Sequence, residues 1–131
     1  MSLLVLSDSD VNSITSTLSP DELITLMATV FSGLSSAQGV CSPHRTSIQT
    51  RNHKVLFMPS RIDSIGTAVK VVSVPTSAEA APRGLPASTL VMDEVTGSVK
   101  AIVNAKSLTA IRTAAGEYAI YDVRVVYMIA E

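Results

Sequence analysis

The stretch STLVMDEVTGSVKAIVN, residues 88–104, decides the fold class of this chain. Two runs rich in aliphatic and β-branched residues, Ser88 to Asp93 and Val99 to Asn104, flank the segment Glu94-Val95-Thr96-Gly97. Glycine readily adopts the positive φ that a bulged hairpin turn requires, so this segment suits the connection between two antiparallel strands. The stretch therefore predicts a β-hairpin.

Upstream of the hairpin, the sequence contains three more short runs rich in β-branched residues. Turn-forming residues separate these runs and bound them, as expected for successive strands. The predicted strands cover residues 46–52, 54–58 and 68–74. The segment from Pro75 to Pro86 is rich in Ala, Pro and Ser and contains Gly84, which predicts an irregular loop.

Two helices are predicted near the amino terminus. Ser7 to Asp10 precede a weakly periodic stretch, as in a brief capped helix. A second helix starts at Ser19, the N-cap, with Pro20 at the first helical position and Glu22 three residues after the cap. Apolar residues then recur at helical spacing from Leu23 to Leu34, so this helix is expected to cover one side of a sheet.

The carboxyl-terminal part predicts one more helix and one more strand. Residues 105–115 place apolar side chains at helical spacing, and Gly116 is expected to end the helix. Tyr118 to Ile129 return to β character, with both faces apolar, so that strand would need cover on both sides.

These elements together predict an α+β fold with a mostly antiparallel sheet and N-terminal helices packed on one face. The whole chain, residues 1–131, is expected to form a single domain. Loops are expected within residues 35–60 and 75–87, and residues 116–131 form a divergent tail that is predicted to be a strand.

The composition excludes several function classes. The formal net charge is −1 with scattered basic residues, which argues against a nucleic-acid partner. No apolar run is long enough to cross a bilayer, and residues 1–7 lack the basic segment of a signal peptide, so a soluble cytoplasmic protein is expected. Hydrophobic residues make up 47% of the chain, so some apolar surface is expected to meet another subunit.

The few His and Cys residues do not predict a metal site. Cys41 is the single cysteine, which excludes an internal disulfide. His44 and His53 lie nine residues apart, with no carboxylate or second thiol at ligand spacing.

Three segments, in order, resemble the ornithine cyclodeaminase/μ-crystallin family. They are Phe57-Met58-Pro59 followed by residues 66–75, Gly84-Leu85-Pro86 leading to residues 89–97, and Leu108-Thr109-Ala110-Ile111-Arg112-Thr113-Ala114-Ala115. The resemblance implies an amino-terminal domain that binds substrate and dimerises. In the family, a dinucleotide-binding domain for NAD(H) or NADP(H) follows it.

The resemblance ends before the nucleotide-binding part of the family pattern. Where the family continues toward a Gly-x-Gly turn, this sequence has Gly116-Glu117-Tyr118, and no glycine-rich loop opens a helix. The chain is therefore expected to be truncated relative to the family and to act without a cofactor.

The resemblance also implies a substrate site made of cations. Arg45, Lys70 and Arg112 match positions where the family gathers positive charge around a substrate carboxylate, and Met58 and Thr113 complete the predicted substrate-binding set. Arginine offers a bidentate fork to a carboxylate, and the pKa of a buried lysine falls readily, so Lys70 is the candidate acid/base. The alternatives are an outward-facing Lys70, a solvated Arg45 or Arg112, and a Met58 that only packs in the core.

Two functions from different classes follow. The first is a cofactor-independent enzyme of small-molecule metabolism, in which Lys70 moves a proton during isomerase, cyclase or lyase chemistry on a carboxylate- or carbonyl-bearing metabolite. The second is a non-catalytic ligand-binding or scaffold protein that forms a homodimer or pairs with a full-length relative. A third possibility is a gene product with an altered tail and no selected function.

Overall fold

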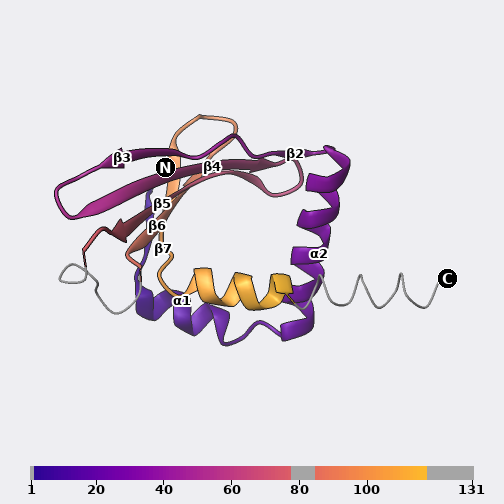
Figure 1. The fold of residues 1–131 in the computed structure, drawn as a ribbon. Helices are drawn as coiled ribbons and strands as arrows, with labels where there is room; N and C mark the ends of the chain where they lie inside the picture. The colour runs from indigo at the N-terminus through magenta and orange to yellow at the C-terminus, as the bar shows by residue number, and fades with distance from the viewer. Residues whose placement is uncertain (1, 78–84, 118–131) are drawn as a thin grey trace.

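The chain folds around one twisted β-sheet in a computed structural model that describes residues 2–77 and 85–117 (Figure 1). The strand order is β1-β7-β6-β5-β4-β2, and β3 also pairs with β4. The strands are β1 (Leu4–Leu6), β2 (Val40–Cys41), β3 (Thr46–Gln49), β4 (His53–Ile62), β5 (Gly66–Pro75), β6 (Ala87–Met92) and β7 (Val99–Asn104). The helices are α1 (Asp8–Thr15), α2 (Pro20–Ser36) and an unlabelled helix over residues 108–117, here called the third helix.

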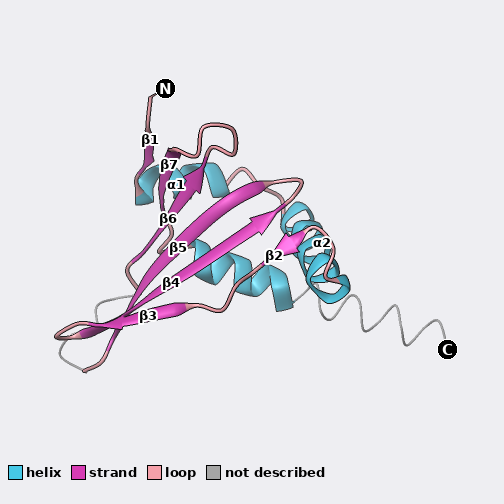
Figure 2. Cartoon of the chain, turned by 90° about the horizontal axis from the view of Figure 1, so that it is seen from above, coloured by secondary structure: helices cyan, strands magenta, loops and turns pink. Residues whose placement is uncertain are grey.

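The predicted fold class is confirmed. Every strand pair is antiparallel except β1 with β7, and α1 and the third helix lie on one side of the sheet (Figure 1). Helix α2 stands at the end of the sheet against β2, and the third helix runs beneath the strands. The other face of the sheet has no described helix on it (Figure 2).

The cap that starts α2 is the one that the sequence predicts, and α1 begins with a cap of the same kind inside the segment Ser7 to Asp10. The Ser7 hydroxyl accepts from the backbone N–H of Asp10, whose carboxylate accepts from the backbone N–H of Ser7. Ser19 and Glu22 form the same reciprocal pair at the start of α2. These bonds satisfy backbone N–H groups that the first turn of a helix leaves without partners.

The predicted hairpin and three upstream strands are confirmed, but β4 is longer than predicted. Pro59 does not end it, because the strand continues through Pro59 to Ile62. On the side away from β5, β4 pairs with β3 over residues 54–57 and with β2 at residues 61–62. Pro59 lies in the unpaired interval, where a missing N–H donor costs least.

The prediction that Gly116 ends the third helix is wrong. The helix continues through residue 117, and Gly116 is buried inside it. A Cβ at this position would lie 3.3 Å from two ring carbons of Phe31 in α2. The glycine therefore allows the two helices to approach closely. The predicted strand from Tyr118 to Ile129, and Gly84 in the predicted loop, lie outside the described residues.

A small core joins the third helix to the sheet. Val72, Ala87 and Ala105 form its buried centre, and partly buried Met58 and Leu108, together with Val74, pack against them. Ala105 is only 1% exposed, and its backbone N–H donates to the Ala87 carbonyl at 2.9 Å. The turn that leads from β7 into the third helix is thus held against the sheet.

We expect Gly116→Val to destabilise the fold by about 1–3 kcal/mol, because its side chain would be forced against the Phe31 ring. Ala110→Val makes a similar change at an exposed position of the same helix and should cost less. Urea unfolding followed by circular dichroism measures both. Equal losses for the two variants would contradict the close helix contact, and a Phe31→Leu background should reduce the cost at Gly116.

Candidate functional site

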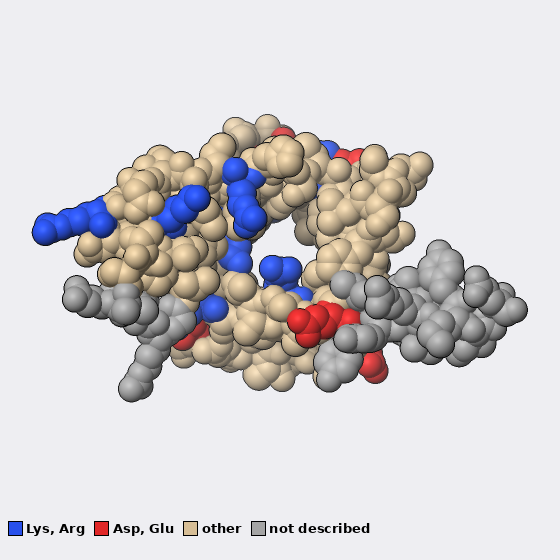
Figure 3. Space-filling model, in the orientation of Figure 1, with Lys and Arg blue, Asp and Glu red and all other residues tan. Residues whose placement is uncertain are grey.

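A cavity of about 350 Å³ lies between the helices and the sheet. Figure 3 shows the molecule hollowed at its centre, with Lys and Arg atoms around the opening. The cavity wall is mostly aliphatic, with a few polar side chains. The lining residues are Thr15, Leu18, Leu23, Leu26, Met27, Lys70, Thr89, Ala105, Leu108, Ile111, Arg112 and Ala115.

Strand β5 directs Lys70 toward the helices and into this cavity. Its Nζ donates a hydrogen bond to the Thr109 hydroxyl of the third helix at 2.6 Å. In the sheet, Lys70 stands opposite Met58 on one side and Thr89 on the other, so these three side chains share the helix-facing surface. The alternative of an outward, solvated Lys70 is therefore wrong.

The pKa of Lys70 lies below the ordinary value of 10.5 for a lysine side chain. Burial is the larger cause, because an ammonium loses hydration in the cavity, and the nearby positive charge of Arg112 is the second. A lowered pKa increases the fraction of neutral amine, which is the form that accepts a proton.

Arg112 reaches the same cavity from the third helix. It lies three residues after Thr109, so the two side chains share one helix face. The exposed Arg112 side chain makes no hydrogen bond or ion pair to any residue in the described part of the chain. The structure thus brings the predicted Lys70–Arg112 pair together, and among residues 2–77 and 85–117 no carboxylate lines the cavity.

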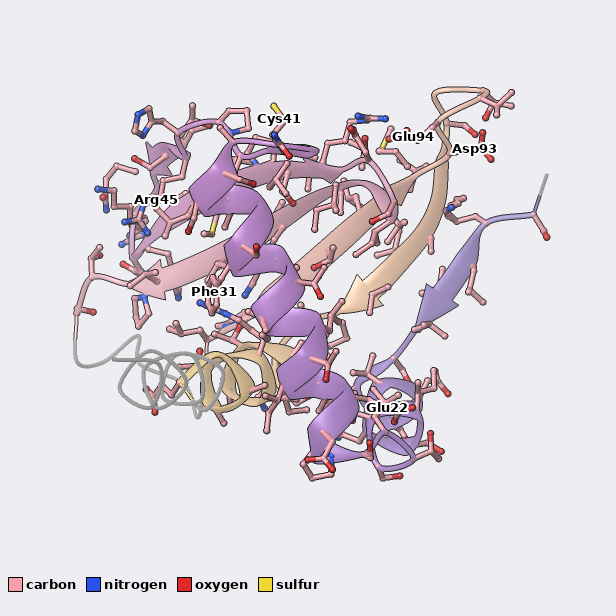
Figure 4. All side chains as sticks on the ribbon, turned by 90° about the vertical axis from the view of Figure 1, so that its right-hand side faces the viewer. Glu22, Phe31, Cys41, Arg45, Asp93 and Glu94 are labelled. Carbon is pink, nitrogen blue, oxygen red and sulfur yellow. The ribbon has the colours of Figure 1, made fainter. Side chains whose placement is uncertain are left out.

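The other predicted site residues do not line this cavity. Met58 faces the helices but packs against the core, which is the alternative that the sequence left open for this residue. The exposed Thr113 turns its hydroxyl back to the Thr109 carbonyl at 2.7 Å. Arg45 is exposed in the segment before β3, beside the sheet (Figure 4). Substrate roles for these three residues stay predictions.

Two hydroxyl-bearing neighbours of Lys70 were not predicted from the sequence. Thr109 stands inside the quoted family segment, three residues before Arg112, and that spacing could have indicated it. Thr89 lies opposite Lys70 only because of the register between β5 and β6, which the sequence alone does not give.

A second polar cluster lies apart from the cavity. Arg61 pairs with Glu94 in the β6–β7 turn, with an Nη2 to Oε2 distance of 2.9 Å, and also with Asp63. Figure 4 shows Glu94 at the far end of the sheet from Arg45. This exposed network joins β4 to the hairpin turn and contributes little net stability in water.

Residues 2–77 and 85–117 offer neither of two other site types. No group of three His, Cys, Asp or Glu side chains within these ranges could hold a metal ion. Neither does any helix in them combine the length and apolar content needed to span a bilayer.

The sequence profile of the ornithine cyclodeaminase/mu-crystallin family matches residues 4–120. The chain belongs to this family. None of the curated proteins with which the sequence was compared matches it significantly.

Solved structures with similar folds come from enzymes of several specificities. A Δ1-pyrroline-2-carboxylate reductase from Thermococcus litoralis, in complex with NADH and L-proline, is 33% identical with a TM-score of 0.73; the match covers 88% of this chain and 36% of that one. An archaeal alanine dehydrogenase dimer with bound NAD is 20% identical with a TM-score of 0.72, over 88% and 35% of the two chains. The chain thus spans about a third of the length of these two related proteins.

The described residues of this family member do not form a dinucleotide-binding loop. Such a loop needs glycines that lead from a strand directly into a helix N-terminus. Gly33 and Gly116 lie inside helices, Gly39 and Gly97 lie in turns that precede strands, and Gly66 is the first residue of β5.

We expect the lowered pKa of Lys70 to appear in the pH dependence of stability. Between that pKa and 10.5 the unfolded chain binds more protons than the folded chain, so the free energy of unfolding rises with pH in this window. In Lys70→Met this rise should be absent, so the wild type should gain stability relative to the variant as pH approaches 10.5.

Denaturant unfolding at a series of alkaline pH values measures this difference. Lys106→Met removes one exposed lysine from the turn before the third helix and controls for the change in net charge. Parallel curves for wild type and Lys70→Met would contradict a depressed Lys70 pKa.

Proposed function

We propose that the chain is the substrate-binding part of a small-molecule enzyme, in which Arg112 holds the carboxylate of an amino, imino or oxo acid next to Lys70. The observation that carries this proposal is the pair of cations at one polar region of an otherwise apolar cavity. Placing two positive charges in such surroundings is costly unless an anion joins them. A bound carboxylate would offset that cost.

The shape of the cavity supports a ligand with an uncharged remainder. Leu23, Met27 and Ile111 line the wall together with other aliphatic residues. A carboxylate at the cations would place the rest of a compact molecule, about the size of proline or leucine, against this wall. The relative that binds L-proline supports this size class.

Lys70 is the residue that we propose moves a proton. With its pKa below the usual lysine value, the neutral amine can take a proton from a carbon next to a C=N or C=O group, while Arg112 holds the carboxylate. For Δ1-pyrroline-2-carboxylate, the C3–H bond breaks, its electron pair forms the enamine double bond, and Lys70 becomes an ammonium. The imine nitrogen takes a proton from water.

This step requires no nucleotide and is the first half of an isomerase, cyclase or lyase reaction. The known relatives with NAD or NADH in their complexes support the small-molecule substrate class rather than this cofactor-independent reaction. The proposed reaction therefore requires Lys70 as the base, and the exchange of substrate hydrogens tests this role.

We expect the chain to accelerate exchange of the C3 hydrogens of Δ1-pyrroline-2-carboxylate in D2O, followed by proton NMR without added nucleotide. Lys70→Met should lower the enzymatic rate by about 100-fold or more, because a positioned general base typically contributes 10²–10⁴-fold. Arg112→Ala should raise the concentration for half-maximal rate by about tenfold or more, since it removes a charged hydrogen-bond partner of the carboxylate.

Arg51→Ala, at an exposed turn between β3 and β4, is the control for loss of an arginine and should change neither quantity. Arg45→Ala in the same assay tests its predicted substrate role directly. Exchange no faster than in buffer, or equal in wild type and Lys70→Met, would contradict the catalytic proposal.

A scaffold role is the second candidate, because the sheet face away from the helices is apolar. Side chains alternate along strands, so residues adjacent to Lys70 point to this outer face, and their cross-strand partners share it. Its central residues are Phe57, Val69, Val71, Leu90 and Ile102. No described element covers them (Figure 2).

We therefore propose that two copies of the chain pair through this outer face. The wild type should then have the mass of a dimer in size-exclusion chromatography with light scattering. Val71→Lys should shift it to monomer, because dimerisation would bury an unpaired ammonium. Val95→Lys, at a 95% exposed turn position, is the control, and a monomeric wild type at all concentrations would contradict this proposal.

A further inference from the structure

One polar contact of the cavity is left without a role by the proposed reaction. Lys70 Nζ lies 2.6 Å from the hydroxyl oxygen of Thr109, which is a short distance for a hydrogen bond from an amine nitrogen to an oxygen. Thirty-nine residues separate the two in sequence. The contact therefore results from the packing of the third helix on the sheet.

The surroundings of Thr109 favour its hydroxyl oxygen as the acceptor of this hydrogen bond. The Thr109 hydroxyl also donates, over a long 3.5 Å, to the carbonyl of Ala105 one turn earlier. With its proton directed to that carbonyl, the oxygen offers its lone pairs to the lysine. Ala105 itself is buried and bonded to the sheet, so the acceptor is attached to a rigid part of the fold.

The other described neighbours of Lys70 do not accept a hydrogen bond from its amine. Met58, opposite it on β4, has no strong acceptor, and no hydrogen bond joins Lys70 to Thr89 on β6 within the described residues. Arg112, on the same face of the third helix, repels the ammonium. No carboxylate lines the cavity in the described ranges. Thr109 is thus the acceptor present for the protonated form.

We propose that Thr109 is a positioning residue, which holds the Lys70 amine at the cavity surface and stabilises its protonated form after proton transfer. This inference rests on the proposed function for its catalytic meaning, but the contact can be tested without any substrate. By accepting a hydrogen bond from the ammonium, the hydroxyl opposes the effects of burial and of Arg112. It also prevents the flexible four-carbon side chain from turning toward solvent.

The primary test measures the protonation of Lys70 directly. Acetic anhydride acetylates neutral amines, and mass spectrometry of the digested protein gives the extent of labelling at Lys70 as a function of pH. In Thr109→Val, which keeps the shape but removes the acceptor, the Lys70 labelling midpoint should move to lower pH. Thr109→Ser should restore the wild-type midpoint, because it restores the hydroxyl.

Thr29→Val is the matched control for a change of helix stability. Thr29 lies on α2 and, like Thr109, bonds its hydroxyl to the carbonyl four residues earlier, but Lys70 donates its hydrogen bond to Thr109 and not to Thr29. This variant should leave the Lys70 midpoint unchanged. An unchanged midpoint in Thr109→Val, or an equal shift in Thr29→Val, would overturn the positioning role.

The exchange assay separates this inference from the proposed function. If the wild type catalyses exchange, Thr109→Val should lower the maximal rate more than it changes the half-saturating concentration, and the pH profile should move in the same direction as the labelling midpoint. If the wild type catalyses no exchange, the proposed reaction fails, while the labelling result still decides whether Thr109 holds Lys70. If Thr109→Val does not fold, the Thr109→Ser and Thr109→Ala midpoints decide between the outcomes.

Discussion

The hydrogen bond from the Ala105 backbone N–H to the Ala87 carbonyl is the constraint on which the cavity depends. It lies where β7 ends, and it directs the chain under the sheet toward the third helix. Because Ala105 is almost fully buried, there is little room for that helix to rotate or slide. The same anchor therefore fixes Thr109 and Arg112, one and two turns further on, relative to Lys70.

Small side chains allow the end of β7 and the turn after it to lie close to the neighbouring strands. Alanine at positions 87, 101 and 105 allows the strands and the turn to approach without large side chains between them. Gly116 has the same effect at the far end of the third helix, where Phe31 of α2 fills the space. The helix is thus fixed at both ends, and the wider gap between these ends is the cavity.

The cavity holds two positive charges close together, whereas charged groups in a protein interior are usually paired with opposite charges. Lys70 and Arg112 share an apolar cavity, and the described lining includes hydroxyl groups but no carboxylate. Coulomb repulsion between two cations is strong where water is partly excluded. Such a pair of cations lowers the stability of the fold relative to a neutral pair. Pairs of this kind are typical of sites that bind a ligand or carry out chemistry.

Local signals in the sequence predicted most of the elements, and contacts between distant residues account for the rest. The caps at Ser7 and Ser19 and the hairpin turn at Gly97 depend on neighbours within a few residues, so each could be predicted. The pairing of Lys70 with Arg112 followed from the family resemblance. The bond to Thr109 and the role of Gly116 depend on how helices pack on the sheet, and no local pattern specifies that.

The parallel pairing of β1 with β7 has a consequence for the order of folding. Leu4 to Leu6 align with Ala101 to Val103, so nearly the whole described chain separates the two partners. During synthesis the first strand has no partner until the last strand of the sheet has emerged, whereas β4 and β5 can pair as soon as their short turn is made. Contacts of such high sequence separation form late and slow the overall rate. Until then the apolar edge of the nascent sheet is open to other chains, and assistance by a chaperone would be most useful at that stage.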